Sequence, residues 1–273
     1  MSSQLEEYKI EKLLGQGSFG SVYRARDKLS NTLVALKVVR ANQMFTIENS
    51  LLQRLATPEC HEYVICLLQS WRDAERGFLV FEFFDGYDLS EIVGNDSLTN
   101  DQIKTLAGHL LTGLSFIHNK GIAHRDIKLE NILFNEGSLK LNIIDVGLAC
   151  AENCKPRGSD TPPGYGRAGT PQYFPPEYFQ IDRVITLEGY QKADIFALGV
   201  VLYELITGEL FDENGPFTLQ QKRRLLSGGR LEMPFNVKYR RIQDPLLQEL
   251  VSFMIESDPS LRPTAAALLQ TYY

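Results

Sequence analysis

The sequence predicts an α+β fold with two lobes, a small strand-rich lobe at residues 8–84 and a larger, mainly helical lobe at 85–273. Two observations predict it. Short runs of β-favouring residues dominate the chain before about residue 85, whereas longer segments with helical periodicity follow it. Of the 273 residues, 44% are hydrophobic, which is enough for a substantial core. We therefore expect residues 1–273 to form one domain with a cleft between its lobes.

The small lobe is predicted from apolar runs that are bounded by polar turns. One stretch with helical spacing, residues 43–56, interrupts these runs. The predicted strands are 8–14, 20–26, 32–40, 64–70 and 77–83.

The larger lobe is predicted from helical periodicity. In residues 99–119, apolar side chains recur at spacings of three and four, which gives a helix one apolar stripe. Residues 192–207 are apolar nearly all round, so we expect this helix to be central and buried. Further helices are predicted near 217–227, 245–256 and 263–271.

Charge and hydrophobicity argue against nucleic-acid-binding, membrane-spanning and secreted classes of protein. The formal net charge of −6 argues against nucleic-acid binding as the primary role. No run approaches the ~18 apolar residues of a membrane span, and the start "MSSQLEEYKI" lacks the pattern of a secretion signal. We therefore expect a cytoplasmic protein, with the nucleus as the alternative location, and neither a nucleic acid nor a membrane as a partner.

The cysteines are too few for a disulfide scaffold at this length, and no pair of them has zinc-ribbon spacing. We expect free thiols in a reducing compartment. Oxidant sensing by Cys150 and Cys154 is the alternative to inert thiols. The four residues are Cys60, Cys66, Cys150 and Cys154.

The stretch "LLGQGSFGSVYRAR" contains Gly15, Gly17 and Gly20. A dinucleotide-binding fold would need a helix directly after the third glycine, but β-favouring residues follow it here. The pattern therefore predicts a hairpin with a flexible tip, whose backbone amides can approach phosphate groups. An ordinary loose turn is the alternative.

The run "TLVALKVVR" puts Ala35 and Lys37 on one face of a strand, among apolar neighbours. Ala35 would offer a flat surface to a purine ring, and Lys37 would reach the phosphates. A lysine in such surroundings needs a counter-charge. The glutamates that follow it before Cys60 are Glu48 and Glu59, and we expect Glu48 to be the partner because it lies in the predicted helix. A solvated surface carboxylate is the alternative for Glu48.

The sharpest signal is "HRDIKLENILF" at residues 124–134, where Asp126, Lys128 and Asn131 precede an apolar strand. A turn at "NEGS" follows, and the return strand ends at Asp145. The hairpin should therefore bring Asn131 and Asp145 side by side. Two oxygen ligands at one place suit Mg²⁺, which completes its shell with phosphate and water.

Taken in order, these motifs resemble the eukaryotic-type protein kinase family, and Lys128 resembles its serine/threonine branch. The resemblance covers residues 8 to 271. It implies a two-lobed kinase-like fold, ATP and Mg²⁺ as cofactors, and transfer of the γ-phosphoryl group of ATP to the hydroxyls of a protein substrate. The motifs are the glycine loop, "VALK" (34–37), "HRDIKLEN" (124–131), "DVG" (145–147), "GTPQYFPPE" (169–177), "ADIFALGVVLYEL" (193–205) and "RPTAAALL" (262–269).

The resemblance implies a role for each matching residue. Asp126 would be the catalytic base, Lys128 would steady the transferring phosphoryl group, and Thr170 would bridge the two. Asn131 and Asp145 would hold Mg²⁺. The remaining nucleotide-binding positions would be Lys37 paired with Glu48, together with Leu14, Gly15, Gln16, Gly17, Ser18, Phe19, Gly20, Val22, Ala35, Phe81, Glu82, Phe84, Asp88, Glu130 and Leu133.

Other matching residues would be structural. Glu177 and Arg262 would form a buried ion pair in the larger lobe. Asp194 would brace the backbone around His124 and Arg125.

One departure from the family pattern is Val146, which stands where a phenylalanine is usual. We expect activity to survive, because neither the chemistry nor metal binding requires the ring. The departure favours a nucleotide-binding scaffold without catalysis as the first alternative. A small-molecule kinase is the second, although the segment 169–177 implies a peptide groove.

The segment between Gly147 and Gly169 lacks a well-placed phosphorylation site, since the available acceptors are Ser159, Thr161 and Tyr165. We expect activity without phosphorylation of this segment, and regulation by the segment itself or by a partner protein in trans. The carboxylates of Glu130 and Glu204 would either receive a basic residue of the substrate or act as ordinary surface or bracing groups.

Overall fold

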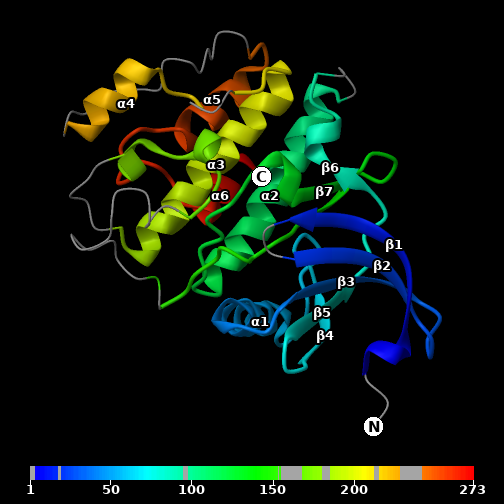
Figure 1. Cartoon of the computed structure of the whole chain (residues 1–273). Helices are drawn as coiled ribbons and strands as arrows, with labels where there is room; N and C mark the ends of the chain where they lie inside the picture. Colours follow the sequence, from blue (N-terminus) through cyan, green and yellow to red (C-terminus); the bar gives the residue numbers. More distant parts are fainter. Residues whose placement is uncertain are drawn as a thin grey trace.

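The computed structural model describes residues 4–17, 20–94, 98–152, 154, 168–179, 185–211, 215–227 and 242–273. Its small lobe is an antiparallel five-stranded sheet in the order β1-β2-β3-β5-β4, with one helix beside it (Figure 1). The elements are β1 (Tyr8–Gly17), β2 (Gly20–Asp27), β3 (Leu33–Arg40), α1 (Gln43–Ala56), β4 (Leu67–Arg72) and β5 (Arg76–Glu82).

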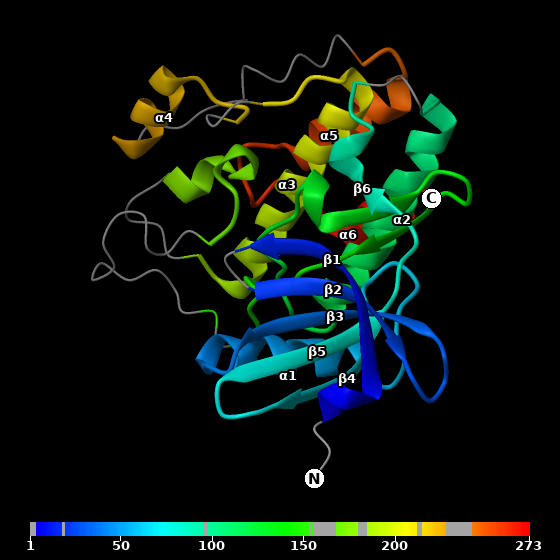
Figure 2. The same cartoon turned by 45° about the vertical axis from the view of Figure 1, so that its right-hand side comes forward.

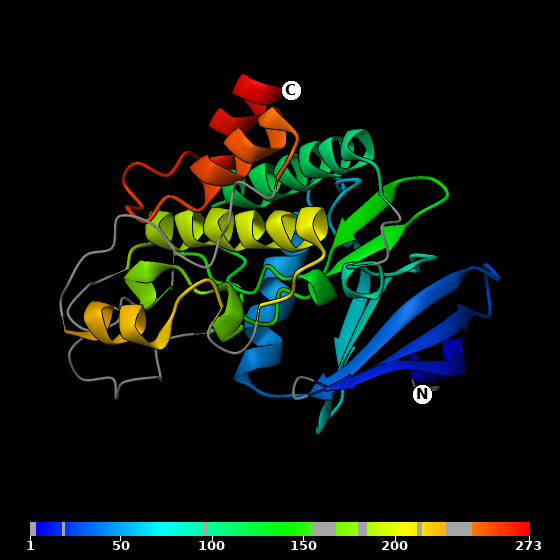
Figure 3. The same ribbon diagram turned by 90° about the horizontal axis from the view of Figure 1, so that it is seen from above.

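The larger lobe is mainly helical and carries a second sheet of three short strands in the order β6-β7-β8. Figures 2 and 3 show the five-stranded sheet set to one side of these helices. The elements are β6 (Tyr87–Asp88), α2 (Asn100–Asn119), β7 (Ile132–Asn135), β8 (Lys140–Ile143), α3 (Leu187–Thr207), α4 (Leu219–Leu226), α5 (Pro245–Met254) and α6 (Ala265–Tyr272). The predicted α+β architecture with two lobes is confirmed.

Helix α3 forms the centre of the larger lobe, as its uniformly apolar sequence predicts. Ile195, Val200 and Val201 are fully buried. The helix begins at residue 187, five residues before the predicted start, because Thr186 caps it by accepting a hydrogen bond from the Gly189 amide. The added turn is more polar than the rest, so apolar periodicity does not reveal it.

The segment between α1 and β4 is hydrogen-bonded to the larger lobe. Predicted as part of a strand from residue 64, it instead pairs with β8 of the larger lobe. The Ile65 amide donates to the Ile143 carbonyl (3.0 Å), and the Ile143 amide donates to the Tyr63 carbonyl (2.9 Å). These bonds fix the strand that leads to Asp145 against the small lobe.

The cysteine prediction is wrong, because the structure pairs Cys60 with Cys66 and Cys150 with Cys154. The Cα atoms are 5.5 and 5.1 Å apart, within the range that a disulfide spans. The partners are six and four residues apart in sequence, so local turns bring them together. Neither a scaffold pattern nor zinc-ribbon spacing would detect such short loops.

Among the described residues, no helix has the length and apolar character needed to cross a membrane.

The predicted ion pair between Glu177 and Arg262 is present and buried. Arg262 Nη1 donates to Glu177 Oε1 at 2.8 Å, and its Nη2 lies 3.2 Å from Oε2. The guanidinium also donates to the carbonyls of Lys192 and Glu256. Arg262 thus ties together three separate segments of the larger lobe.

We predict that Arg262→Met lowers the free energy of unfolding by about 3–5 kcal/mol, because it leaves the Glu177 carboxylate buried without its partner. Urea unfolding measures the change. The matched control is Arg76→Met, which breaks an exposed pair with Asp73 and should cost ~1 kcal/mol or less. Equal losses in the two variants would contradict a special role for the buried pair.

Candidate active site

A cavity of about 340 Å³ lies between the lobes. It is lined by the sheet of the small lobe and α1 on one side, and by β7, the residues just before it and the turn after β8 on the other. Most of the residues predicted to bind a nucleotide line it: Leu14, Gly15, Val22, Ala35, Lys37, Glu48, Phe81, Glu82, Phe84, Asp88, Glu130, Asn131, Leu133 and Asp145.

The rest of the glycine loop lies beside this cavity. Gly17 and Gly20 line a neighbouring cavity of about 610 Å³, and Gln16 is exposed near the end of β1. Ser18 and Phe19 lie outside the described residues. Only glycine fits at position 20, because φ is +132° and a Cβ atom would lie 2.3 Å from the Val38 carbonyl oxygen.

The Lys37 side chain connects three elements of the site. Its Nζ lies 2.6 Å from Glu48 Oε1 on α1 and 2.9 Å from Asp145 Oδ1 beyond β8. Burial disfavours the charge on Lys37, but the two carboxylates outweigh burial and raise its pKa. Burial alone would raise the pKa of Asp145, but the nearby Lys37 ammonium outweighs burial and lowers that pKa. Lys37 and Asp145 are therefore both held in their charged forms.

The turn after β8 gives Asp145 its position. Asp145 has φ of +60°, a left-handed conformation that aspartate tolerates better than most residues. The Gly147 amide donates to Asp145 Oδ1 at 3.3 Å, and a Cβ atom on Gly147 would lie 3.1 Å from that oxygen. The glycine therefore allows the carboxylate to fold back over the turn and face Lys37.

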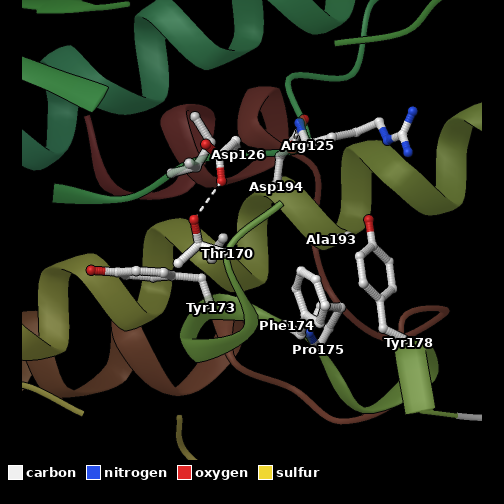
Figure 4. A pocket seen from close by; sticks show the side chains of 11 residues that line it. Arg125, Asp126, Thr170, Tyr173, Phe174, Pro175, Tyr178, Ala193 and Asp194 are labelled. Atoms are coloured by element: carbon white, nitrogen blue, oxygen red, sulfur yellow. Dashed lines mark hydrogen bonds between the residues drawn. The ribbon is translucent and has the colours of Figure 1, made fainter. Parts of the chain in front are cut away.

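Across the cleft, Asp126 is held by both of its oxygens. Thr170 donates its hydroxyl hydrogen to Oδ1 (2.8 Å), and Asn131 Nδ2 donates to Oδ2 (2.9 Å). Lys128 Nζ donates to the Thr170 oxygen at 3.1 Å and lies 3.4 Å from Asp126 Oδ2. Figure 4 shows Asp126 and Thr170 pointing toward one another. Thr170 thus bridges Asp126 and Lys128.

The backbone that carries Asp126 is braced from α3. Asp194 accepts hydrogen bonds from the amides of His124 (2.8 Å) and Arg125 (2.7 Å), as predicted. Sequence reasoning missed His118, at the end of α2, whose Nε2 lies 3.0 Å from Asp194 Oδ2. Nothing in the local sequence distinguishes this histidine from a surface residue, because the contact spans 76 positions.

A family model described as protein kinase domain matches residues 8–273 of this chain. The chain belongs to the protein kinase family. It is 30% identical to a CBL-interacting serine/threonine-protein kinase 13 of Arabidopsis thaliana over 97% of the chain and 51% of that protein.

Two further relatives are similar over nearly the whole chain. An Aurora kinase of Dictyostelium discoideum is 32% identical over 95% of the chain and 64% of that protein. A cAMP-dependent protein kinase catalytic subunit 3 of Drosophila melanogaster is 30% identical over 94% of the chain and 41% of that protein. The chain thus spans roughly half of these relatives' length.

Protein kinases as a family use ATP and Mg²⁺, and the oxygen atoms of this site fit a magnesium ion. Asn131 Nδ2 donates to the Asp126 carbonyl as well as to its carboxylate, which leaves the amide oxygen of Asn131 as an acceptor. Asp145 is partly exposed and lines the same cavity. The described residues hold no cluster of three or more histidine, cysteine or acidic side chains that could cage a metal. Mg²⁺ bound to a nucleotide typically takes one or two protein oxygens and completes its shell with phosphate and water.

Several residues that line the kinase cavity were not predicted: Leu52, Ile65, Phe83, Ile144 and Val146. Leu52 could have been found, because it lies four residues after Glu48 on the same face of a helix. Val146 is 2% exposed and packs in the main core of the protein. Val146 is therefore a buried side chain that lines the cavity.

The two carboxylates considered for substrate binding differ in exposure. Glu130 is exposed and lines the cavity. Glu204 is 1% exposed and accepts hydrogen bonds from the Tyr173 hydroxyl (2.9 Å) and the Phe211 amide (3.0 Å). This geometry supports the bracing alternative for Glu204.

The Arg125 guanidinium stacks on the Tyr190 ring, with Cζ 4.7 Å from its centroid. The candidate phosphate acceptors Ser159, Thr161 and Tyr165 lie outside the described residues.

We predict that Glu204 makes the stability of the protein fall as pH rises from 4.5 to 7. Burial raises its pKa to about 7 against the opposing effect of its hydrogen bonds. Between these pH values the folded protein binds a proton that the unfolded chain has released, so stability is highest below the window and lower above it. The loss amounts to roughly 3 kcal/mol at most.

Urea unfolding at pH 5 and pH 8 tests this pH dependence. Glu204→Gln should lose less stability than the native chain over this interval, whereas Glu188→Gln, an exposed change on α3, should behave like the native chain. Parallel curves for the native chain and Glu204→Gln would contradict the assignment.

Proposed function

We propose that this chain is an ATP-dependent protein serine/threonine kinase, which transfers the γ-phosphoryl group of ATP to hydroxyl groups of protein substrates. The observation that carries the proposal is that Asn131, which lines the cavity, joins two charged groups of side chains. Lys37, Glu48 and Asp145 line the same cavity and form the first group. Asp126 with Lys128 forms the second, and the Asp126 carboxylate accepts a hydrogen bond from Asn131. Each group suits one half of the reaction.

The nucleotide would lie in the cavity between the lobes. Leu14, Val22, Ala35 and Leu133 line an apolar part of it that suits a purine ring. The backbone at residues 82–84 would offer hydrogen bonds to the ring edge. Asp88 would contact the ribose, although its carboxylate also accepts a hydrogen bond from the Ser90 amide at 3.0 Å.

Lys37 would bind the α and β phosphates, since its charge is maintained by two carboxylates in a buried setting. Asn131 and Asp145 would hold Mg²⁺, which when bound supplies positive charge to the phosphate oxygens. Glu48 would keep Lys37 in place when Asp145 turns toward the metal.

Asp126 would orient the substrate hydroxyl and accept its proton. Hydrogen bonds from Thr170 and Asn131 fix the plane of the carboxylate, so little reorganisation is needed. Lys128 would steady the phosphoryl group during transfer. Because phosphoryl transfer has a loose transition state, catalysis rests mainly on positioning and charge neutralisation.

The substrate class is a proposal that rests on two observations. The relatives named above include a serine/threonine-protein kinase, and Lys128 stands at the motif position that resembles the serine/threonine branch. Glu130 is exposed at the cavity, so a basic residue near the acceptor hydroxyl is favoured. A regulatory partner in trans stays a prediction from the sequence.

We predict that Asp126→Asn lowers the rate of phosphoryl transfer by at least ~100-fold, because the amide cannot accept the proton of the substrate hydroxyl. The assay follows labelled phosphate from ATP into a basic protein and identifies the modified residue type. The matched control is Asp101→Asn, a surface carboxylate on α2, which should leave the rate unchanged.

Labelling of serine or threonine by the native chain, and its loss in Asp126→Asn, would support the proposal. An absence of labelling in the native chain would overturn it in favour of a nucleotide-binding scaffold.

A further inference from the structure

The disulfide Cys150–Cys154 begins five residues after Asp145 (150 − 145), at the start of the segment that leaves the active site. The phosphoryl transfer proposed above does not use it. The Cys154 amide donates to the Ala151 carbonyl at 2.9 Å, so a backbone turn and a covalent bond close the same short loop.

One end of this loop is attached to the catalytic loop. The Cys150 amide donates to the Ala123 carbonyl (3.0 Å), and the Ala123 amide donates to the Cys150 carbonyl (2.9 Å). Ala123 directly precedes the segment 124–126 that ends in the proposed base. The disulfide loop therefore starts from a fixed point of the active site.

The loop also contacts the helix that carries Glu48. Glu152, between the two cysteines, accepts hydrogen bonds from Arg54 Nη1 at 2.9 and 3.0 Å. Arg54 lies six residues after Glu48 on α1 (54 − 48), or about 9 Å along the helix. Gly121 leaves room for it, since a Cβ atom there would lie 2.9 Å from Arg54 Nη2.

The ion pair alone would be a weak connection. The side chains of Arg54 and Glu152 are 39% and 73% exposed, and such pairs gain little because two flexible side chains must be ordered. A disulfide that closes the loop around Glu152 restricts the conformations of its backbone. Part of the ordering is then already supplied, which strengthens the connection between α1 and the catalytic loop.

We propose that Cys150 and Cys154 form a reversible redox site that controls this kinase. In the disulfide state, Glu152 holds Arg54 and so keeps α1, with Glu48, in place beside Lys37. Reduction releases the loop, loosens α1 and lowers activity. The inference rests on the proposed function for its effect on rate, but its effect on α1 is independent of catalysis.

The reductant would be a dithiol. Its thiolate attacks the sulfur of Cys154, which is more exposed than Cys150, and the S–S bond breaks to leave Cys150 as a thiolate that takes up a proton. The second thiol of the reductant then attacks the mixed disulfide and releases Cys154. Two electrons and two protons pass to the protein, and the dithiol leaves as a cyclic disulfide.

The other disulfide supplies a matched control. Cys60 and Cys66 close a loop between α1 and β4, but neither the Arg54 nor the Glu152 side chain lies in it. Three variants are compared with the native chain, each with and without dithiothreitol: Cys150→Ser/Cys154→Ser, Cys60→Ser/Cys66→Ser and Glu152→Gln.

The measurements are kcat/KM for phosphoryl transfer, hydrogen exchange of the α1 amides, and mass spectrometry of alkylated peptides to count disulfides. We expect dithiothreitol to lower kcat/KM about two- to fivefold, the range that an exposed ion pair contributes, and to speed α1 exchange in the native chain and in Cys60→Ser/Cys66→Ser. Cys150→Ser/Cys154→Ser and Glu152→Gln should show the lower kcat/KM and the faster α1 exchange both with and without dithiothreitol.

Free thiols at both positions in the untreated native chain would overturn the inference. Hydrogen exchange of the α1 amides that does not change with dithiothreitol would also overturn it. Equal responses of the two double variants to dithiothreitol would overturn it as well, because they would indicate a general loss of stability. Faster α1 exchange on reduction without any phosphoryl transfer would instead refute the proposed function and leave the redox site standing.

Discussion

The charge of Lys37 is the interaction on which the rest of this structure depends. A lysine on a strand with apolar neighbours is unfavourable unless acids meet it, and here one acid comes from α1 and another from the turn after β8. A single ammonium group therefore links the helix, the strand and the turn. Backbone bonds between residues 63–65 and Ile143 support the same arrangement from behind.

The second half of the site uses a different device. The Asp126 carboxylate accepts hydrogen bonds from the neutral side chains of Thr170 and Asn131. The neighbouring backbone is anchored to the buried helix α3, because Asp194 accepts a hydrogen bond from the Arg125 amide. A rigid central helix thus supports the group proposed to handle the proton. Such support suits a reaction that depends mostly on positioning.

Much of this could be predicted from the sequence because the signals are local. Periodicity located α1 and α2, and the motifs paired Lys37 with Glu48 and Asn131 with Asp145. The ion pair between Lys37 and Asp145 was not predicted, because its partners are 108 positions apart in sequence. Contacts between distant segments could not be predicted in this way: His118 on Asp194, the bridge of residue 64 to β8, and the polar first turn of α3 have no local signal. The two disulfides were missed because the number of cysteines indicates only the redox compartment of the protein. Whether two particular cysteines can pair depends on the geometry of the loop between them.

The central claim is that Lys37, Asn131 and Asp145 together form a site for a magnesium-bound nucleotide. Calorimetric titration of ATP into the purified chain, with and without Mg²⁺, tests it most directly. The account predicts binding that strengthens at least ~10-fold when Mg²⁺ is present and that weakens when Lys37 is replaced by methionine. Nucleotide binding that is absent, or that is equal with and without the metal, would contradict it.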